Sequence, residues 1–316
     1  MVLSTTTPPE PVLRWAADQM GMRASVIAVQ GLKDGAHPWL LRIRHAGQMT
    51  QAVLRLGDPD HPEWLATEAA ALALAKDHNL AAPRLLGVDL VGPAGMPAVL
   101  MTVLPGTSRI PAVASTERLR AMGAAAAAMH AVPLAPGPDL PLRLRPIAGV
   151  DFSAERRATG SSSLLQAAEA RLQELPAPAG PTVFVHGDLW QGNSMWSGEE
   201  FVGVVDWDQA GAGHPGVDLG WLRFDAAILY GADAPAEILD GWRDASGREP
   251  DAVAYWDGVA ALCSPADMAD WLAVFHRQGR TDLNVATLNR RRDAFLRQAL
   301  EKLHTEQAQK PRVRGV

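Results

Sequence analysis

The chain has 316 residues, of which 47% are hydrophobic and 20% are charged, and its net charge is −6 at pH 7. This composition is typical of a globular protein; it excludes disorder along the whole chain and disfavours a nucleic-acid partner. The longest weakly apolar run, Ala121–Met129, is far shorter than the roughly 20 residues that span a bilayer, so no membrane partner is expected. A start without a signal-peptide pattern and a single cysteine, Cys263, together predict a cytoplasmic protein without disulfides.

The first hundred residues predict a small antiparallel sheet with one helix. Five short β-rich runs are separated by Gly, Asp and Pro turn signals. They lie at residues 24–30, 39–44, 51–56, 85–91 and 97–103. A helix is predicted at about 64–78, and the Pro-rich start of the chain predicts a loose end. Because the sequence LPG at 104–106 breaks the last run, we expect one structural unit at 1–104 and a second at 105–316.

From residue 116 the pattern is mostly helical. An Ala-rich helix at 116–131 comes first, and further helices are predicted after a Pro-rich linker. They lie at about 161–175, 217–230, 234–245, 250–262, 266–278 and 282–304. Short strands at 182–185, 193–196 and 201–205 interrupt this helical series. These elements together predict an α+β fold with a small antiparallel-sheet part and a larger, mainly helical part.

Two of these short strands are each followed by a carboxylate. Asp188 lies in the segment VHGDLWQGN at 185–193, and Asp206 lies in VVDWD at 204–208. A strand that ends in Asp presents the carboxylate at a sheet edge, so we expect Asp188, Asn193 and Asp206 to meet. Two carboxylates and an amide oxygen are hard ligands that suit Mg²⁺. The spacing H-x-D-L-x-x-x-N, with an Asp on a following strand, is the pattern of a kinase catalytic loop.

Through HGDLWQGN and VVDWD the chain resembles the small-molecule kinases of the aminoglycoside phosphotransferase and choline kinase type, over nearly its whole length. The resemblance implies a bilobal, protein-kinase-like fold, with a nucleotide-binding lobe at 1–104 and a catalytic, substrate-binding lobe at 105–316. It also implies ATP or another nucleoside triphosphate, Mg²⁺, and a hydroxylated small molecule as acceptor. Within this resemblance Asp188 matches the catalytic base, and Asn193 and Asp206 match the Mg²⁺ ligands.

Three more residues match supporting positions of the same family. His186 matches a residue that orients the catalytic loop, and Asp218, in HPGVDLG, matches one that anchors the backbone of this loop. Asp208 would share a strand face with Asp206, and it either helps to bind metal or substrate or has a purely structural role.

The N-terminal part offers residues for the nucleotide. The family places a phosphate-contacting Lys on the third strand, but the strand AVLRL at 52–56 contains no Lys, so Arg55 is expected in this role. Its acidic partner on the next helix should be Glu68, with Glu63 as the alternative. The loop that covers the phosphates should lie at 30–37, where Gly31 and Gly35 permit close approach of the backbone. The adenine-binding hinge should include the backbone of Met101 and Val103.

The substrate is expected to be an antibiotic of the aminoglycoside or macrolide type. Residues 217–270 contain eleven Asp and Glu against three Arg, which favours a cationic substrate such as an aminoglycoside. The ten Trp residues leave a macrolide or another bulky natural product open.

Two other functions remain open from the sequence. A two-metal hydrolase could use a set of His and Asp side chains, namely His186, Asp188, Asp206, Asp208, His214 and Asp218. A nucleotide-binding regulator without catalytic activity is favoured only by Arg55 in the place of Lys.

Overall fold

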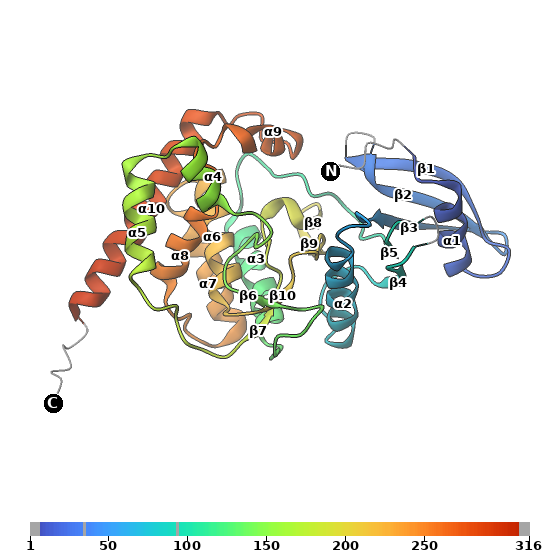
Figure 1. Ribbon diagram of the computed structural model, residues 1–316, viewed down its shortest axis with the longest axis horizontal. Coiled ribbons are helices and arrows are strands. Elements are labelled where there is room, and N and C mark those ends of the chain that lie inside the picture. Colours follow the sequence, from blue (N-terminus) through green and yellow to red (C-terminus); the bar gives the residue numbers. More distant parts are fainter. Residues whose placement is uncertain (1–6, 34–35, 93–94, 310–316) are drawn as a thin grey trace.

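The computed structural model describes residues 7–33, 36–92 and 95–309. Figure 1 shows a sheet with two helices at one end of the molecule and a mainly helical part at the other. The predicted α+β fold is therefore confirmed, with an antiparallel-sheet N-terminal part and a helical C-terminal part. The sheet has the strand order β1-β2-β3-β5-β4, and every pair in it is antiparallel. Its strands are β1 (Ser25–Lys33), β2 (Ala36–His45), β3 (Gln48–Leu56), β4 (Leu85–Asp89) and β5 (Ala98–Thr102).

One face of this sheet is covered by helix α1 (Glu10–Gln19), which the sequence analysis did not predict. The face is apolar because alternate residues of β2, such as Trp39, point toward it and are fully buried. Helix α1 contributes Val12 to the same apolar cluster. Pro9 lies just before the first turn, where Pro is well tolerated because the first N–H groups of a helix have no intrahelical partner. The Pro-rich segment thus leads into a helix, and residues 1–6 of the predicted loose end lie outside the described residues.

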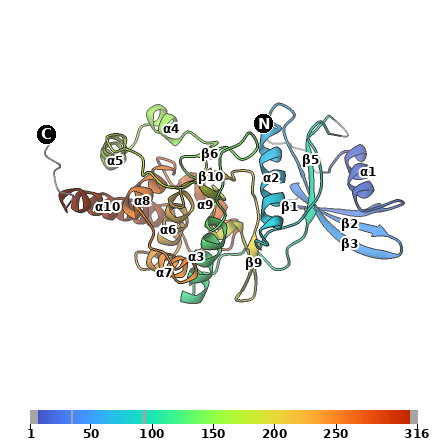
Figure 2. The same cartoon turned by 90° about the horizontal axis from the view of Figure 1, so that it is seen from below.

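The opposite face of the sheet directs Arg55 toward the rest of the molecule. Helix α2 (Glu63–Asp77) covers this face, and its Leu72 belongs to one apolar cluster with Val99 of β5. Figure 2 shows α2 between the sheet and the helical part. Arg55 on β3 is paired in register with Val99, so its side chain lies on the side of α2.

The C-terminal part is built around helix α6 (Gly216–Tyr230), of which residues 216–229 are all buried. The remaining helices are α3 (Thr116–His130), α4 (Phe152–Thr159), α5 (Ser163–Gln173), α7 (Ala234–Ser246), α8 (Val253–Leu262), α9 (Ala269–Arg277) and α10 (Val285–Gln309). Helices α3 and α7 approach each other closely at Gly123, where a Cβ atom would come within 2.0 Å of the carbonyl oxygen of Ile238. Glycine is required there because no other residue leaves room for the neighbouring backbone.

Short strands connect these helices to the sheet-containing part. A three-stranded sheet has the order β6-β10-β7, with β6 at Leu142–Arg143, β7 at Val183–Val185 and β10 at Gly211–Gly213. A separate hairpin consists of β8 (Ser194–Ser197) and β9 (Glu200–Val204). The strands before the two predicted carboxylates, β7 and β9, therefore belong to different sheets, which corrects the expectation that one sheet edge presents both.

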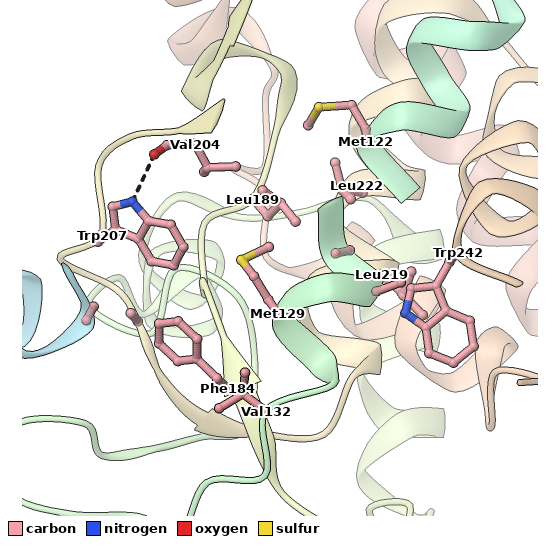
Figure 3. Packing of buried hydrophobic residues seen from close by; sticks show 14 of the residues in the cluster. Met122, Met129, Val132, Phe184, Leu189, Val204, Trp207, Leu219, Leu222 and Trp242 are labelled. Carbon is pink, nitrogen blue, oxygen red and sulfur yellow. Dashed lines mark hydrogen bonds between the residues drawn. The ribbon is translucent and has the colours of Figure 1, made fainter. Parts of the chain in front are cut away.

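An apolar core fixes the segment that follows β9. Trp207 is buried, its ring stacks on Phe184 of β7 at 5.4 Å between centroids, and its indole N–H donates to the carbonyl oxygen of Val204 at 2.9 Å (Figure 3). Because Trp207 is held in the core, the aspartates on either side of it, Asp206 and Asp208, face the sheet-containing part.

Several short elements were not predicted. Helix α4 spans only eight residues between two loops, and β6 and β10 have two and three residues, so none of them produces a readable periodicity. The predicted boundary after residue 104 falls between the end of β5 and the start of α3, and the division into two lobes at that point remains our proposal. In the part of the chain that the structure describes, helices that are both long enough and apolar enough to cross a membrane are absent.

Candidate active site

Arg55 joins three carboxylates that come from both parts of the molecule. Its Nη1 donates to Oε1 of Glu68 on α2 at 2.7 Å and to Oδ1 of Asp206 at 2.5 Å. Its Nη2 donates to Oδ2 of Asp208 at 2.9 Å. Glu68 is fully buried, whereas the alternative partner Glu63 is exposed and bonds His61. The structure thus pairs Arg55 with Glu68, and the same guanidinium also bonds Asp206 and Asp208.

The charged groups in this cluster shift one another's pKa values. Burial raises the pKa of Glu68 to about 7, although Arg55 opposes this shift. Burial also acts to raise the pKa of Asp206, but Arg55 and Lys33 hold it well below its usual range. For Asp208, burial and the neighbouring Asp206 together raise the pKa. Asp206 is accordingly the carboxylate that the surrounding cations keep ionised most firmly.

Asp188 lies in the loop after β7 with both of its carboxylate oxygens hydrogen-bonded. Oδ1 accepts the indole N–H of Trp221 at 3.0 Å, and Oδ2 accepts Nδ2 of Asn193 at 3.0 Å. The same Asn193 nitrogen also donates to the backbone carbonyl of Asp188 at 2.9 Å. Burial and the negative charge of Asp206 raise the pKa of Asp188 well above its usual value, while these hydrogen bonds oppose the shift.

One face of α6 holds this loop at three points. Asp218 accepts the backbone N–H groups of His186 and Gly187, both at 2.8 Å. Trp221, one turn further on, bonds Asp188, and Asp225, a second turn further on, accepts the backbone N–H of Gln191 at 3.0 Å. The loop is therefore aligned along the helix.

Only the first of these three anchors was predicted. Trp221 and Asp225 are functional candidates that the sequence analysis missed. They lie three and seven residues after Asp218, on the same face of α6, but the sequence alone does not distinguish them from core positions.

The segments of Asp188 and Asp206 are also joined directly. The backbone N–H of Val205 donates to the carbonyl oxygen of Asn193 at 2.8 Å, and Nε2 of His186 lies 3.1 Å from the carbonyl oxygen of Val205. Strand β9 ends at Val204, and Asp206 has a φ of 70°, a left-handed conformation that costs a non-glycine residue roughly 1–3 kcal/mol. Asp208 thus reaches Arg55 from a turn, and the expected sharing of a regular strand face with Asp206 is wrong.

The residues predicted to cover the phosphates are placed as follows. Gly31 lies inside β1, paired with Trp39, because β1 continues to Lys33; the predicted loop at 30–37 is therefore mostly strand. Gly35 lies outside the described residues. Lys33, which had no assigned role, places its Nζ 3.5 Å from Oδ2 of Asp206. The signal for it was that Lys33 is one of only four lysines in the chain and lies in the segment 30–37 that was expected to cover the phosphates.

The two predicted hinge residues lie at the end of β5. Met101 is a strand residue whose side chain is buried in the core, and Val103 follows the strand directly. Their contact with adenine remains a prediction.

A cavity of about 220 Å³ opens beside Asp188 in the helical part. Its wall is mainly aromatic and aliphatic, and Asp225 supplies a second carboxylate. The aromatic residues are Phe152, Trp190, Trp221, Phe224, Trp271 and Phe275. They come from α4, the loop after β7, α6 and α9, so the aromatic wall of this cavity belongs to the helical part.

The predicted hydrolase ligands are not brought together. His214 stacks on Trp256 at 5.1 Å, away from Asp188, and Asp218 uses both oxygens on the loop backbone. Over residues 7–33, 36–92 and 95–309, groups of three or more His, Cys, Asp and Glu side chains suited to a metal ion are absent.

A single Mg²⁺ does fit the residues at the Arg55 cluster. Asp206 offers an ionised carboxylate, and Asn193 offers an amide oxygen, because its Nδ2 is the atom that bonds Asp188. These are the hard oxygen donors that Mg²⁺ prefers, usually one or two from the protein with the rest from phosphate and water.

Known proteins share sequence and structure with this chain. The model of the phosphotransferase enzyme family matches residues 28–262. A homoserine kinase from Methylobacterium nodulans is 33% identical over 123 residues, which are 35% of this chain and 36% of that protein, so the match spans about a third of its length.

Solved structures show the same fold. The apoenzyme of a macrolide 2′-phosphotransferase from Brachybacterium faecium has a TM-score of 0.58 at 18% identity, covering 97% of this chain and 100% of that one. An aminoglycoside-3′-phosphotransferase of type VIII has a TM-score of 0.50 at 18% identity, covering 78% of this chain and 97% of that one.

Proposed function

Since the chain belongs to the phosphotransferase enzyme family, we propose that it transfers the γ-phosphoryl group of ATP, or of another nucleoside triphosphate, to a hydroxyl of a small molecule. The observation that carries this proposal is the position of Asp188. It lines an apolar cavity, and it is close enough to the cluster of Arg55 and Asp206 for the charge of Asp206 to raise its pKa. The cavity fits an acceptor molecule, and the cluster of Arg55 and Asp206 fits Mg²⁺ and phosphate. The single cysteine supports a cytoplasmic location for this activity.

In this proposal Asp188 accepts the proton of the acceptor hydroxyl while that oxygen forms its bond to the γ-phosphorus. The bond between the γ-phosphorus and the bridging oxygen of the β-phosphate breaks, and ADP leaves. The raised pKa of Asp188 makes it a stronger base than an exposed carboxylate. Trp221 and Asn193 fix its two oxygens before the substrate arrives.

The remaining residues act on the phosphates. Asn193 and Asp206, with Asp208 nearby, would hold Mg²⁺, which neutralises the charge on the phosphate oxygens when it is bound. Arg55 and Lys33 supply positive charge from β3 and β1. Arg55 can replace the usual lysine because a guanidinium binds phosphate oxygens in a bidentate manner.

For the acceptor, we extend the proposal to an antibiotic, and the cavity favours the bulky apolar type over an aminoglycoside. The acidic segment 217–270 gives little support to a polycationic substrate, because several of its carboxylates are paired with arginines of this chain. Asp257 is buried against Arg223, and Glu237 bonds Arg120. Of this segment, Asp225 is the carboxylate that lines the cavity.

The proposal is tested by incubating the protein with ATP and Mg²⁺ and a panel of hydroxylated compounds, followed by mass spectrometry. The panel holds macrolides, aminoglycosides, other antibiotics, sugars and homoserine. We expect one compound to gain a single phosphoryl group while ADP appears in equal amount. If nucleotide does not bind and ATP is not consumed with any compound, the proposal fails.

Trp221→Phe should move the acid limb of the pH–rate profile to higher pH. The substitution removes the indole N–H that stabilises the ionised form of Asp188, so the pKa of Asp188 rises further. Because only the ionised carboxylate accepts the hydroxyl proton, kcat should fall more at pH 6 than at pH 9. The profile is measured with saturating substrate and nucleotide.

Trp271→Phe is the matched control for this variant. Trp271 lines the same cavity, but its indole makes no hydrogen bond to Asp188. We expect it to change KM for the acceptor and to leave the acid limb in place. An acid limb at the same pH in the wild type and in Trp221→Phe would show that the indole of Trp221 does not act through Asp188.

A further inference from the structure

We propose that Asp208 is a positioning residue for Arg55: it holds the second terminal nitrogen of the guanidinium and so fixes the orientation in which Arg55 contacts phosphate. This inference rests on the proposed function, because the contact between Arg55 and phosphate belongs to that function. It assigns Asp208 to the arginine and not to the metal ion, so Asp208 is required only because residue 55 is an arginine.

The three nitrogens of the Arg55 guanidinium differ in their partners. Nη1 donates to Glu68 at 2.7 Å and to Asp206 at 2.5 Å, so both of its N–H groups are used. Nη2 donates to Asp208 at 2.9 Å, and Nε is buried without a hydrogen-bond partner among the described residues. Asp208 therefore holds the end of the guanidinium that Glu68 does not bond.

An arginine at this position depends on a second acceptor. The side chain of Arg55 is only 14% exposed, so water is a poor replacement for a lost protein partner. Without Asp208, two of the three nitrogens, Nη2 and Nε, would have no partner, and an unpartnered buried donor is costly. A lysine has a single nitrogen, for which Glu68 would be a sufficient partner. The need for Asp208 thus follows from the fork shape of the guanidinium.

Asp208 is itself held in place by the helical part. Trp207, the residue before it, is packed in the core (Figure 3), which fixes the backbone next to Asp208. Oδ1 of Asp208 accepts Nε2 of Gln209 at 3.4 Å, and Oε1 of Gln209 accepts the backbone N–H of Gly149 at 3.3 Å. The carboxylate therefore connects Arg55 to a packed segment of the protein.

The partners of Asp206 leave that carboxylate freer to bind a metal ion. Oδ2 of Asp206 lies 3.5 Å from Nζ of Lys33, whose side chain is 66% exposed, so this contact is loose. Both oxygens of Asp208, in contrast, are bonded by side chains that are mostly buried. With Asp206 engaged on Mg²⁺, Arg55 has one free N–H on each terminal nitrogen. Two such donors bind two phosphate oxygens together.

The affinity for a nucleoside diphosphate without metal ion measures the contact between Arg55 and phosphate. The probe is ADP or GDP, whichever the wild type binds more tightly, titrated calorimetrically into the full-length protein in EDTA. Asp208→Asn keeps the shape of the side chain and loses its charge. We expect the affinity for the diphosphate to fall about tenfold, the size of one charge-assisted hydrogen bond. The affinity for the corresponding nucleoside, which lacks phosphate, should stay unchanged.

A double-mutant cycle with Arg55→Lys tests whether Asp208 acts through the arginine. In the Arg55→Lys protein, the addition of Asp208→Asn should lower the affinity no further, because a single ammonium group needs only Glu68 as its partner. Equal losses from Asp208→Asn in the wild type and in Arg55→Lys would overturn the proposal, as would an unchanged affinity in Asp208→Asn alone. Asp244→Asn, which changes an exposed carboxylate of α7, is the matched control and should behave as the wild type.

Two further measurements separate this role from metal binding and from loss of the fold. A metal ligand at Asp208 would make Asp208→Asn weaken binding only when Mg²⁺ is present, and this result would overturn the proposal. A crystal structure of the wild type with the same diphosphate requires no variant to fold. We expect Nη2 of Arg55 to stay within about 3 Å of Asp208 while the guanidinium contacts phosphate. A guanidinium that leaves Asp208 for the phosphate would contradict the positioning role.

Phosphoryl transfer is scored separately by mass spectrometry, so this proposal and the proposed function fail in different ways. Transfer to an acceptor, together with a diphosphate affinity that Asp208→Asn does not change, would refute the role of Asp208 and leave the kinase function in place. A loss of affinity that depends on Arg55, without transfer to any acceptor, would support the role of Asp208 and refute the kinase function. A wild type that binds neither ADP nor GDP would refute both.

Discussion

Asp188→Asn is expected to lower kcat by about a thousandfold, the contribution of a general base in this type of reaction. The amide has the size of the carboxylate but cannot accept the hydroxyl proton. Nucleotide affinity should change little, because the nearest phosphate-binding candidates, Arg55 and Lys33, do not bond Asp188. Initial rates at saturating ATP and acceptor, together with calorimetric titration of ADP, separate these two effects.

The hydrogen bonds of Asp188 make the control important. An amide at this position accepts through one oxygen only, so either Trp221 or Asn193 loses its acceptor. The melting temperature of the variant therefore has to be measured beside its rate, and Asp139→Asn, on an exposed loop, serves as the control for the loss of a charge. A folded Asp188→Asn protein that retains a tenth or more of the wild-type kcat would remove Asp188 from the role of base.

The candidate site residues could be named from the sequence because they are close together in it. Asp188, Asn193 and Asp206 lie within nineteen consecutive residues, and their chemical role remains a prediction. What the pattern could not give is their geometry. The strands belong to two sheets, and Asp206 adopts a left-handed conformation that a strand-based argument does not anticipate.

The residues that line the cavity were not predictable in the same way. Trp221 and Asp225 lie on a helix that is buried along almost its whole length, so its sequence shows no polar face that would distinguish a functional position from a core position. The role of a buried carboxylate depends on which partner it finds. Asp257 on α8 pairs with Arg223, whereas Asp225 lines a cavity. The sequence does not distinguish these two aspartates.

The N-terminal part contains elements that the sequence predicts and contacts that it does not. The five strands and α2 were predicted because apolar residues alternate and turn residues separate them. The pairing of Arg55 with Glu68 followed from resemblance to a kinase, but the two further bonds to Asp206 and Asp208 depend on how the two parts of the molecule meet. Such contacts between distant segments have no signature in a single sequence.

Arg55→Ala is expected to destabilise the protein by about 3 kcal/mol, since removal of one partner leaves buried charge without compensation. Glu68 is fully buried and loses its ion pair with Arg55, while Asp206 and Asp208 lose the cation that they share. Urea unfolding monitored by circular dichroism gives the free energy of unfolding. If Arg55 binds phosphate as proposed, nucleotide affinity should also fall, by about tenfold or more, because the bidentate contact is lost.

A double-mutant cycle distinguishes the structural effect from the effect on nucleotide. Glu68→Gln removes the buried charge, so combining it with Arg55→Ala should restore part of the lost stability. The nucleotide affinity should stay low in the double variant, because the phosphate contact belongs to Arg55 and not to Glu68. Arg55→Lys keeps the charge, but one ammonium group replaces a guanidinium that bonds three carboxylates through two nitrogens, so an intermediate stability is expected. Stability and nucleotide affinity that both remain at wild-type values in Arg55→Ala would show that this guanidinium neither joins the two parts of the molecule nor binds phosphate.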